Sequence, residues 1–230
     1  SGRGLDFCSN EENFKWSGRP WNRAEKLMLL YVLRHGLTPW NHLHKAQGSA
    51  DIPLAQEGID LAKRTGEALM DVNFDMCFTS PLTRARQTAS LVLGGREVLT
   101  IPDKRIQEIN FGDLEGHIMR KGNSMESDCG EFDLFFRDPL KFPRPRNGEN
   151  IQDVLDRTRD FWLEKTTDPS LADKTILVSS HGCAVRALLQ NLYQDPEHFW
   201  HGCVPPNCSI NLVEVKDGKA RFLEEDKVYA

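Results

Sequence analysis

Two histidines and a pair of arginines are the residues of this chain best suited to chemistry. His35 follows Arg34 directly after an apolar run, His181 follows a second apolar run, and Arg84 comes soon after a third. An arginine side chain presents a planar fork of N–H donors that matches the oxygens of a phosphate group. Because an open α/β sheet binds ligands beyond the carboxyl ends of its strands, these segments are expected to meet at one rim and capture a phosphate there.

Each of these residues also has an ordinary structural explanation. A histidine at a strand end is commonly a hydrogen-bonded structural residue, and Arg84 could be a solvated helix charge, the interpretation preferred for Arg86. Glu108 lies in a predicted loop and, considered by itself, would be interpreted as a surface carboxylate. The hypothesis of a phosphate site therefore depends on the combination of these residues.

The apolar periodicity predicts the sheet that would hold this rim. Continuous apolar runs predict buried strands, and apolar positions three and four residues apart predict helices. Strands are expected at 27–33, 75–79, 98–101 and 175–179, helices at 56–70, 84–93, 149–165 and 183–193, and a hairpin at 208–215 and 220–224. Strands that alternate with helices imply a three-layer α/β/α sandwich with a mostly parallel central sheet.

The chain is expected to hold one catalytic domain with a small insertion. That domain spans 27–230 and follows an N-terminal extension at 1–26. Residues 117–147 interrupt the alternation of strands and helices and predict a cap or lid beside the site. Four basic residues of this insertion would either recognise an acidic substrate or form a solvated loop; they are Arg137, Lys141, Arg144 and Arg146.

Composition and charge narrow the class of protein. The formal net charge of −5 argues against non-specific binding of nucleic acid, which needs a basic surface. The longest informative apolar run, 27–33, is far shorter than the roughly 20 residues of a membrane-spanning helix. Neither a nucleic acid nor a membrane is therefore an expected partner.

The six cysteines are interpreted as reduced thiols. Residues 1–26 hold no apolar stretch typical of a secretory signal, so we expect a cytoplasmic protein without a disulfide framework. A zinc site would draw on His198, His201, Cys203 and Cys208, but their spacing matches no paired-ligand pattern and a Pro-Pro pair separates the cysteines. We therefore expect no bound metal.

Five stretches, taken in order, resemble the histidine phosphatase superfamily, to which the cofactor-dependent phosphoglycerate mutases belong. They are LLYVLRHGLTPWNHLHKAQGSADIPLAQEG at 29–58, TSPLTRARQTA at 79–89, EINFGDLEG at 108–116, RNGEN at 146–150 and VSSHG at 178–182. Their order and spacing fit the family through nearly the whole chain.

The resemblance implies a metal-independent phosphomonoesterase with a phosphohistidine intermediate. His35 would be the nucleophile, its second ring nitrogen donating to a backbone carbonyl, while Arg34, Arg84 and His181 surround the phosphoryl oxygens. Glu108 would protonate the leaving alcohol and then take a proton from the attacking water. The other phosphate- and substrate-binding residues implied by the resemblance are Thr38, Asn41, Gln47, Gly48 and Gly182.

Two departures from the mutases favour the phosphatase branch. Leu37 stands where mutases usually carry Glu, and Glu108 is followed by Ile-Asn-Phe-Gly rather than by the Arg-His-Tyr-Gly type. The expected substrate is a small phosphorylated metabolite, no cofactor is expected, and the protein would be a monomer or a homodimer. One alternative is a phosphoglycerate mutase primed by a bisphosphate. A non-enzymatic module that binds a phosphorylated ligand is another, which the presence of His35 and Glu108 disfavours.

Overall fold

A six-stranded mixed sheet forms the centre of the computed structural model, which describes residues 26–119, 130–193, 195 and 198–229. The strand order is β3-β2-β4-β1-β5-β6. Strands β3, β2, β4 and β1 run parallel to one another, β5 runs antiparallel to β1, and β6 runs antiparallel to β5. The strands are β1 (Leu27–Arg34), β2 (Met76–Thr79), β3 (Leu99–Pro102), β4 (Thr175–Ser180), β5 (Ser209–Lys216) and β6 (Lys219–Val228). The predicted mostly parallel sheet is confirmed, whereas the predicted extension lies outside the described residues except for Lys26.

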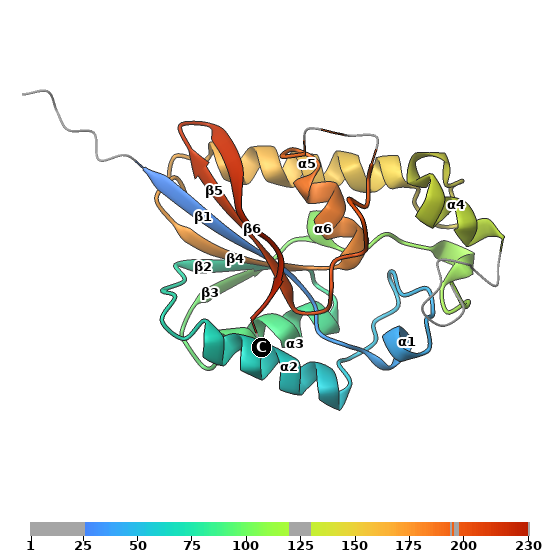
Figure 1. Cartoon of the computed structure of the whole chain (residues 1–230), viewed down its shortest axis with the longest axis horizontal. Helices are drawn as coiled ribbons and strands as arrows, with labels where there is room; N and C mark the ends of the chain where they lie inside the picture. The colour runs from blue at the N-terminus through green and yellow to red at the C-terminus, as the bar shows by residue number, and fades with distance from the viewer. Residues whose placement is uncertain (1–25, 120–129, 194, 196–197, 230) are drawn as a thin grey trace, which may run out of the picture.

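Helices cover both faces of this sheet. In Figure 1, α5 and α6 lie on one side of the strands, and α2 and α3 lie on the other. The helices are α1 (Pro39–His42), α2 (Gln56–Ala68), α3 (Thr83–Leu93), α4 (Glu131–Arg137), α5 (Ile151–Thr167) and α6 (Gly182–Leu189), with 3-10 turns η1 (Lys104–Ile106), η2 (Gly112–Leu114) and η3 (Pro139–Lys141). The predicted three-layer sandwich is confirmed. None of the described helices combines the length and the apolarity that a membrane crossing requires.

Strand β1 is almost continuously apolar up to Arg34 because both of its faces are covered. Successive side chains of a strand point to opposite sides of the sheet. Leu30 and Val32 therefore pack with Phe161 in the core beneath α5 and α6, while Tyr31 and Leu33 pack in the core beneath α2 and α3. Full burial of each such aliphatic side chain stabilises the fold by roughly 1.5–3 kcal/mol.

Local capping sets several helix ends. Helix α3 ends at Leu93, the end that the sequence predicted, and it is capped by Gly94, whose backbone has a φ of 59° in the left-handed region. Helix α5 begins after Asn150, whose side chain accepts the N–H of Asp153 while the Asp153 carboxylate accepts the N–H of Asn150. This reciprocal cap places the start of α5 two residues later than predicted.

Helix α6 is shorter than the sequence predicted. It ends at Leu189 rather than at residue 193. There the side-chain amide of Gln190 donates to the carbonyl of Arg186 at 3.1 Å and to the carbonyl of Phe199 at 3.0 Å. These two bonds satisfy a carbonyl at the helix end and tie the following turn to a distant segment, which ends the helix.

The described part of the predicted lid packs as an aromatic cluster. Residues 120–129 lie outside the described residues, while Ile118 forms an isolated antiparallel bridge with Lys45. The rings of helix α4, and Phe142 directly after turn η3, pack against the starts of α5 and α6. The cluster consists of Phe111, Phe132, Phe135, Phe136, Phe142, Phe199 and Trp200. The lid is therefore joined to the α5–α6 layer by buried apolar side chains.

Candidate active site

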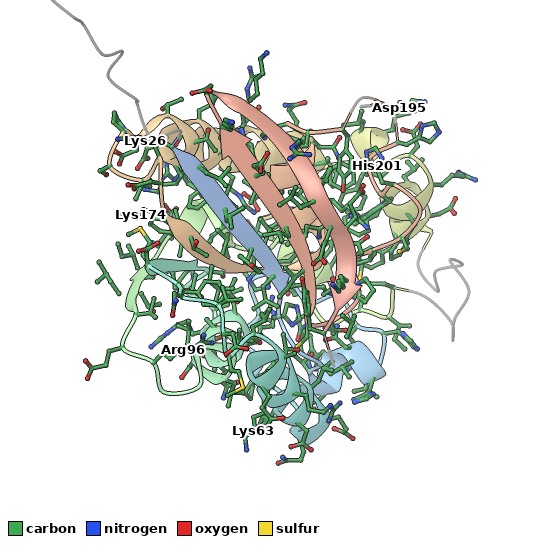
Figure 2. The ribbon with its side chains drawn as sticks, turned by 60° about the vertical axis from the view of Figure 1, so that its left-hand side comes forward. Lys26, Lys63, Arg96, Lys174, Asp195 and His201 are labelled. Carbon is green, nitrogen blue, oxygen red and sulfur yellow. The ribbon has the colours of Figure 1, made fainter. Side chains whose placement is uncertain are left out.

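The carboxyl ends of β1 and β4 bring the two histidines together. Lys26 and Lys174, labelled in Figure 2, precede these two strands at the other end of the sheet. At the carboxyl ends, the N–H of His35 donates to the carbonyl of Ser180 at 3.0 Å. The ring centroids of His35 and His181 lie 5.1 Å apart. The parallel register of β1 and β4 thus creates a two-histidine rim.

His35 is held in a single neutral tautomer. Its Nδ1 lies 2.7 Å from the carbonyl oxygen of Gly36, which can only accept, so Nδ1 carries the proton and Nε2 keeps its lone pair. Burial, together with the charges of Arg84 and Arg34, holds the pKa of His35 well below its usual value. The ring is therefore neutral at pH 7 and nucleophilic at Nε2.

His181 is fully buried and serves as the N-cap residue of α6. Its Nε2 lies 2.7 Å from Ser80 Oγ, which also accepts the N–H of Leu82, so the Ser80 hydroxyl proton can be donated to Nε2. The ring proton is then on Nδ1, a buried atom with no protein partner among the described residues. Burial, with Arg84 and His35 nearby, lowers the pKa of His181, so the imidazole offers a donor rather than a charge when no anion is bound.

Arg84 is a buried cation rather than a solvated helix charge. Its side chain is fully buried, and its Nη1 and Nη2 donate to the carbonyls of Ala50 and Gly48, both at 2.7 Å. Burial lowers the pKa of Arg84 to about 10, so the group stays charged at neutral pH. A buried cation that donates only to carbonyls gains from a nearby anion. Arg86, by contrast, is exposed as predicted.

Arg34 is fixed by two close neighbours at the same rim. Its Nη1 donates to the carbonyl of Pro205. A Cβ on Gly182 would lie 3.5 Å from Arg34 Nε and only 2.7 Å from a methyl group of Val204. The lack of a side chain at Gly182 therefore lets the Arg34 guanidinium and the start of α6 approach each other.

Glu108 is buried, so its interpretation as a surface carboxylate is wrong. Its Oε1 accepts the N–H groups of Ile109 and Ala184, both at 3.0 Å, and its Oε2 accepts the N–H of Cys183 at 3.1 Å. Burial raises the pKa of Glu108 even though these three bonds and the charge of Arg84 oppose that shift. The carboxyl group is thus fixed at the start of α6 with a raised proton affinity.

The turn after β1 is tied together by side-chain amides. Thr38 Oγ1 donates to Gln47 Oε1 at 2.7 Å, and the Thr38 N–H donates to Asn41 Oδ1 at 3.1 Å. Asn207 Nδ2 donates to the carbonyl of His35 at 3.0 Å. The Asn41 oxygen is therefore occupied, and its NH₂ group is the end left to donate to a ligand.

Two positioning residues were not found from the sequence. Glu115 accepts the N–H groups of Gly48 at 3.0 Å and Ser49 at 2.8 Å. It thereby holds the same loop whose carbonyl groups accept the hydrogen bonds of Arg84. Arg157 of α5 donates to the carbonyl of Glu108 at 3.0 Å. Glu115 does lie within the stretch 108–116 already singled out, but Arg157 has only the pattern of an ordinary helix charge.

A cavity of about 540 Å³ opens at this rim. Of the residues predicted for the site, six line it: Arg34, His35, Asn41, Gln47, Glu108 and Gly182. The other four are not among its lining residues: Thr38, Gly48, Arg84 and His181. The cavity side formed by the lid and its neighbours, which we call the aromatic wall, consists of Phe111, Phe135, Phe136 and Trp200.

Four basic residues in the described part of the lid do not line this cavity. Each forms an ion pair with an aspartate and has a side chain more than half exposed. The pairs are Arg137–Asp133 at 2.8 Å, Lys141–Asp138 at 2.7 Å, Arg144–Asp153 at 2.6 Å and Arg146–Asp113 at 3.8 Å. Of the two sequence interpretations, the structure favours the solvated loop over recognition of an acidic substrate.

Within the described part of the chain, no group of three or more His, Cys, Asp or Glu side chains could hold a metal ion. The described cysteines carry no disulfide; they are Cys77, Cys183, Cys203 and Cys208. Cys8 and Cys129 lie outside the described residues. The positive charge close to the rim thus comes from Arg34 and Arg84.

The fold and this rim define an α/β/α protein with His35, Arg34 and Glu108 in the lining of one cavity and with His181 and Arg84 buried close to the rim. The chain belongs to the histidine phosphatase superfamily (branch 1), whose sequence profile matches residues 30–226. It is therefore an enzyme of the histidine phosphatase class, as its resemblance to this family implied.

Relatives of this chain carry both kinds of activity in their names. It is 33% identical to 2,3-bisphosphoglycerate-dependent phosphoglycerate mutase 2 of Gloeobacter violaceus, over 72% of this chain and 76% of the relative. The structure of Bacillus stearothermophilus YhfR is 30% identical, with a TM-score of 0.77 over 87% of this chain and 97% of that one. Phosphoserine phosphatase of Entamoeba histolytica, solved with phosphoserine, is 27% identical, with a TM-score of 0.70 over 87% and 97% of the two chains.

Proposed function

We propose that this enzyme is a metal-independent phosphomonoesterase that hydrolyses a small phosphorylated metabolite through a phosphohistidine at His35. The observation that carries the proposal is the bond from His35 Nδ1 to the carbonyl of Gly36, which leaves Nε2 as the nucleophilic atom of a neutral ring. Arg34 lines the same cavity, and Arg84 lies buried close to the rim.

In the first step, His35 Nε2 attacks phosphorus and the bond from phosphorus to the ester oxygen breaks. Phosphoryl transfer asks the protein mainly for positioning and for stabilisation of charge on the equatorial oxygens. Arg34, Arg84 and the Nδ1 donor of His181 supply that stabilisation, and the Asn41 amide adds a further donor. The negative charge of the phosphate also favours protonation of His181, which strengthens this interaction.

Glu108 supplies the proton that the departing alkoxide needs. Its Oε1 accepts two backbone N–H groups and its Oε2 only one, so Oε2 is the oxygen with room for the proton. In the second step a water molecule gives its proton back to Glu108 and attacks the phosphohistidine. His35 then leaves as neutral imidazole and inorganic phosphate is released.

A phosphoglycerate mutase is the second candidate, because relatives about a third identical carry that name. Two features of the cavity favour the phosphatase. Leu37 lines it where the mutases usually carry Glu, and the basic lid residues from Arg137 to Arg146 pair with aspartates outside it. The described lid residues at the cavity therefore offer no cation to the carboxylate and second phosphate of a bisphosphoglycerate.

A screen for phosphate release separates the two candidates. A panel of phosphorylated metabolites is assayed with and without 2,3-bisphosphoglycerate, each in the presence and absence of excess chelator. The proposal expects phosphate release that needs neither the bisphosphate nor a divalent ion, together with an acid-labile phosphoenzyme. Isomerisation of phosphoglycerate that requires the bisphosphate would support the mutase instead. Loss of hydrolysis in chelator, restored by a divalent ion, would contradict the mechanism.

A further inference from the structure

The cavity is divided between a charged rim and a largely uncharged remainder. Apart from histidines, its charged lining residues among those described are Arg34, Lys45 and Glu108. Arg34 and Glu108 belong to the rim, so within the described lining Lys45 is the permanent charge left for the rest of a ligand. The Lys45 ammonium lies 5.6 Å from the ring centroid of Trp40, a favourable cation–π contact.

The aromatic wall is held together by contacts among its own residues. The indole N–H of Trp200 donates to the carbonyl of Phe135 at 3.0 Å. The ring of Phe135 lies 5.2 Å, centroid to centroid, from each of the rings of Phe111, Phe136 and Trp200. Aromatic pairs at such distances are attractive and restrict one another. An apolar group can therefore bind against this wall without the cost of ordering it first.

The remaining lining offers apolar surface to the same ligand. Phe136 is half-buried, so part of its ring stays accessible, and Leu37 and Val204 are half-buried in the lining as well. A cavity of about 540 Å³ falls within the range of sites that enclose a whole small organic molecule. The phosphate would fill only the rim, which leaves the apolar part of the cavity to the organic part of the ester.

A charged organic group would fit this space poorly. A carboxylate placed against the aromatic wall would lose its hydration, and a desolvated charge is costly unless it is paired. Arg137, Lys141, Arg144 and Arg146 are already paired with aspartates outside the cavity. Among the described lining residues, only Lys45 is left to balance the charge, and it would give up its contact with Trp40.

Building on the proposed function, we infer that the preferred substrates are phosphomonoesters of alcohols with an uncharged apolar body, such as an aromatic ring or an alkyl chain of several carbons. That body packs against the aromatic wall while the phosphate binds Arg34 and faces His35. Small esters with a second charge, including phosphoglycerate, are then poor substrates.

Alkyl phosphates of increasing length test this inference by turnover. Ethyl, butyl and hexyl phosphate have leaving alcohols of similar acidity, so differences in kcat/KM report the binding of the chain rather than the ease of bond breaking. Burial of a methylene is expected to raise kcat/KM by up to about fourfold, from roughly 0.8 kcal/mol per CH₂. Equal kcat/KM along the series, or a value for 3-phosphoglycerate above that for hexyl phosphate, would overturn the inference.

Alkylphosphonates test the wall without requiring turnover, because their carbon–phosphorus bond is not hydrolysed. Calorimetric titration with ethyl- and hexylphosphonate should give a lower Kd and a more negative heat-capacity change for the hexyl compound. Equal Kd values alongside continued phosphate release from esters would sink the inference and leave the proposed function standing. Tight binding of hexylphosphonate by a chain that neither releases phosphate nor forms phosphohistidine would contradict the proposed function and leave the apolar binding surface supported.

Two substitutions in the lid identify the surface responsible. Phe136→Ala removes the half-buried ring of the wall and should lower the hexyl-to-ethyl ratio of kcat/KM by roughly tenfold. Leu140→Ala is the matched control, because Leu140 belongs to the same segment but is 55% exposed and does not line the cavity. An equal change of the ratio in both variants, or none in Phe136→Ala, would show that the wall does not select the substrate.

Discussion

The rim and the aromatic wall of one cavity are built in opposite ways. At the rim, backbone groups hold the functional side chains: Gly36 fixes His35, and the start of α6 fixes Glu108. The wall is held by side chains, with rings from three segments far apart in the sequence packed on one another. A position held by the backbone is set by the fold, whereas a position held by packing changes with each substitution.

This difference assigns chemistry to the rim and selectivity to the wall. Substitutions at the rim should lower the turnover of all esters to a similar extent, provided that the esters have leaving groups of similar acidity. Changes in the wall should affect esters according to the size of their organic part. Each prediction below tests one side of that division.

The largest effect is expected for His35→Ala, which removes the proposed nucleophile. Turnover of p-nitrophenyl phosphate and of every alkyl phosphate should fall by at least about 10³-fold, and the acid-labile phosphoenzyme should disappear. Steady-state kinetics and rapid acid quench with labelled substrate measure the two outcomes. A variant that keeps near-normal kcat, or loses activity on long-chain esters alone, would refute the assignment.

Glu108→Gln should separate esters by their leaving group. The amide keeps the size of the side chain but cannot donate its proton as an acid, and acid catalysis typically contributes roughly 10²–10⁴-fold. Ethyl phosphate should lose activity on that scale, whereas p-nitrophenyl phosphate, whose leaving group is a stable anion, should lose far less. Single-turnover phosphorylation rates provide the comparison. Equal losses would mean that Glu108 only holds the start of α6 in place.

The buried histidines of the rim should make folding stability depend on pH. Their pKa values are lowered in the folded state, so below about pH 6.5 the unfolded chain binds protons that the folded chain does not. The free energy of unfolding should therefore decrease as the pH is lowered, by up to about 1.4 kcal/mol per histidine from pH 7.5 to pH 5.5. Glu108, whose pKa is raised, acts in the opposite sense and reduces this slope.

Urea unfolding at the two pH values measures that slope. His181→Gln should lose about half of the histidine contribution, and saturating phosphate should reduce the slope in the unsubstituted protein because it favours charged imidazole. A slope that His181→Gln does not change would place its origin outside the rim.

The smallest effect is expected for Trp200→Phe, a change confined to the wall. The substitution removes the indole N–H that donates to Phe135, a bond worth about 0.5–1.5 kcal/mol net. The hexyl-to-ethyl ratio of kcat/KM should fall a few-fold, while the phosphohistidine should still form. An equal loss of kcat/KM on hexyl and ethyl phosphate would contradict the assignment of substrate selectivity to the wall.

The sequence predicted the sheet and the rim because both depend on local signals. Apolar runs mark strands such as β1 whatever the distant contacts are, and His35 and His181 each directly follow such a strand. Arg157 could not be assigned, because its role depends on a carbonyl that lies 49 positions away along the chain. The end of α6, where Gln190 bonds Phe199, and the ion pairs of Arg144 and Arg146 likewise depend on neighbours that local propensity does not reveal.

Helix α6 joins the two halves of the proposed reaction in one rigid body. His181 caps its first turn, and the N–H groups of Cys183 and Ala184 hold Glu108. A thermal displacement of α6 against the sheet therefore carries the anion-facing imidazole and the proton donor in the same direction. A substitution that shifts α6 is therefore expected to displace both groups together, so one helix sets the spacing between the anion-facing imidazole and the proton donor.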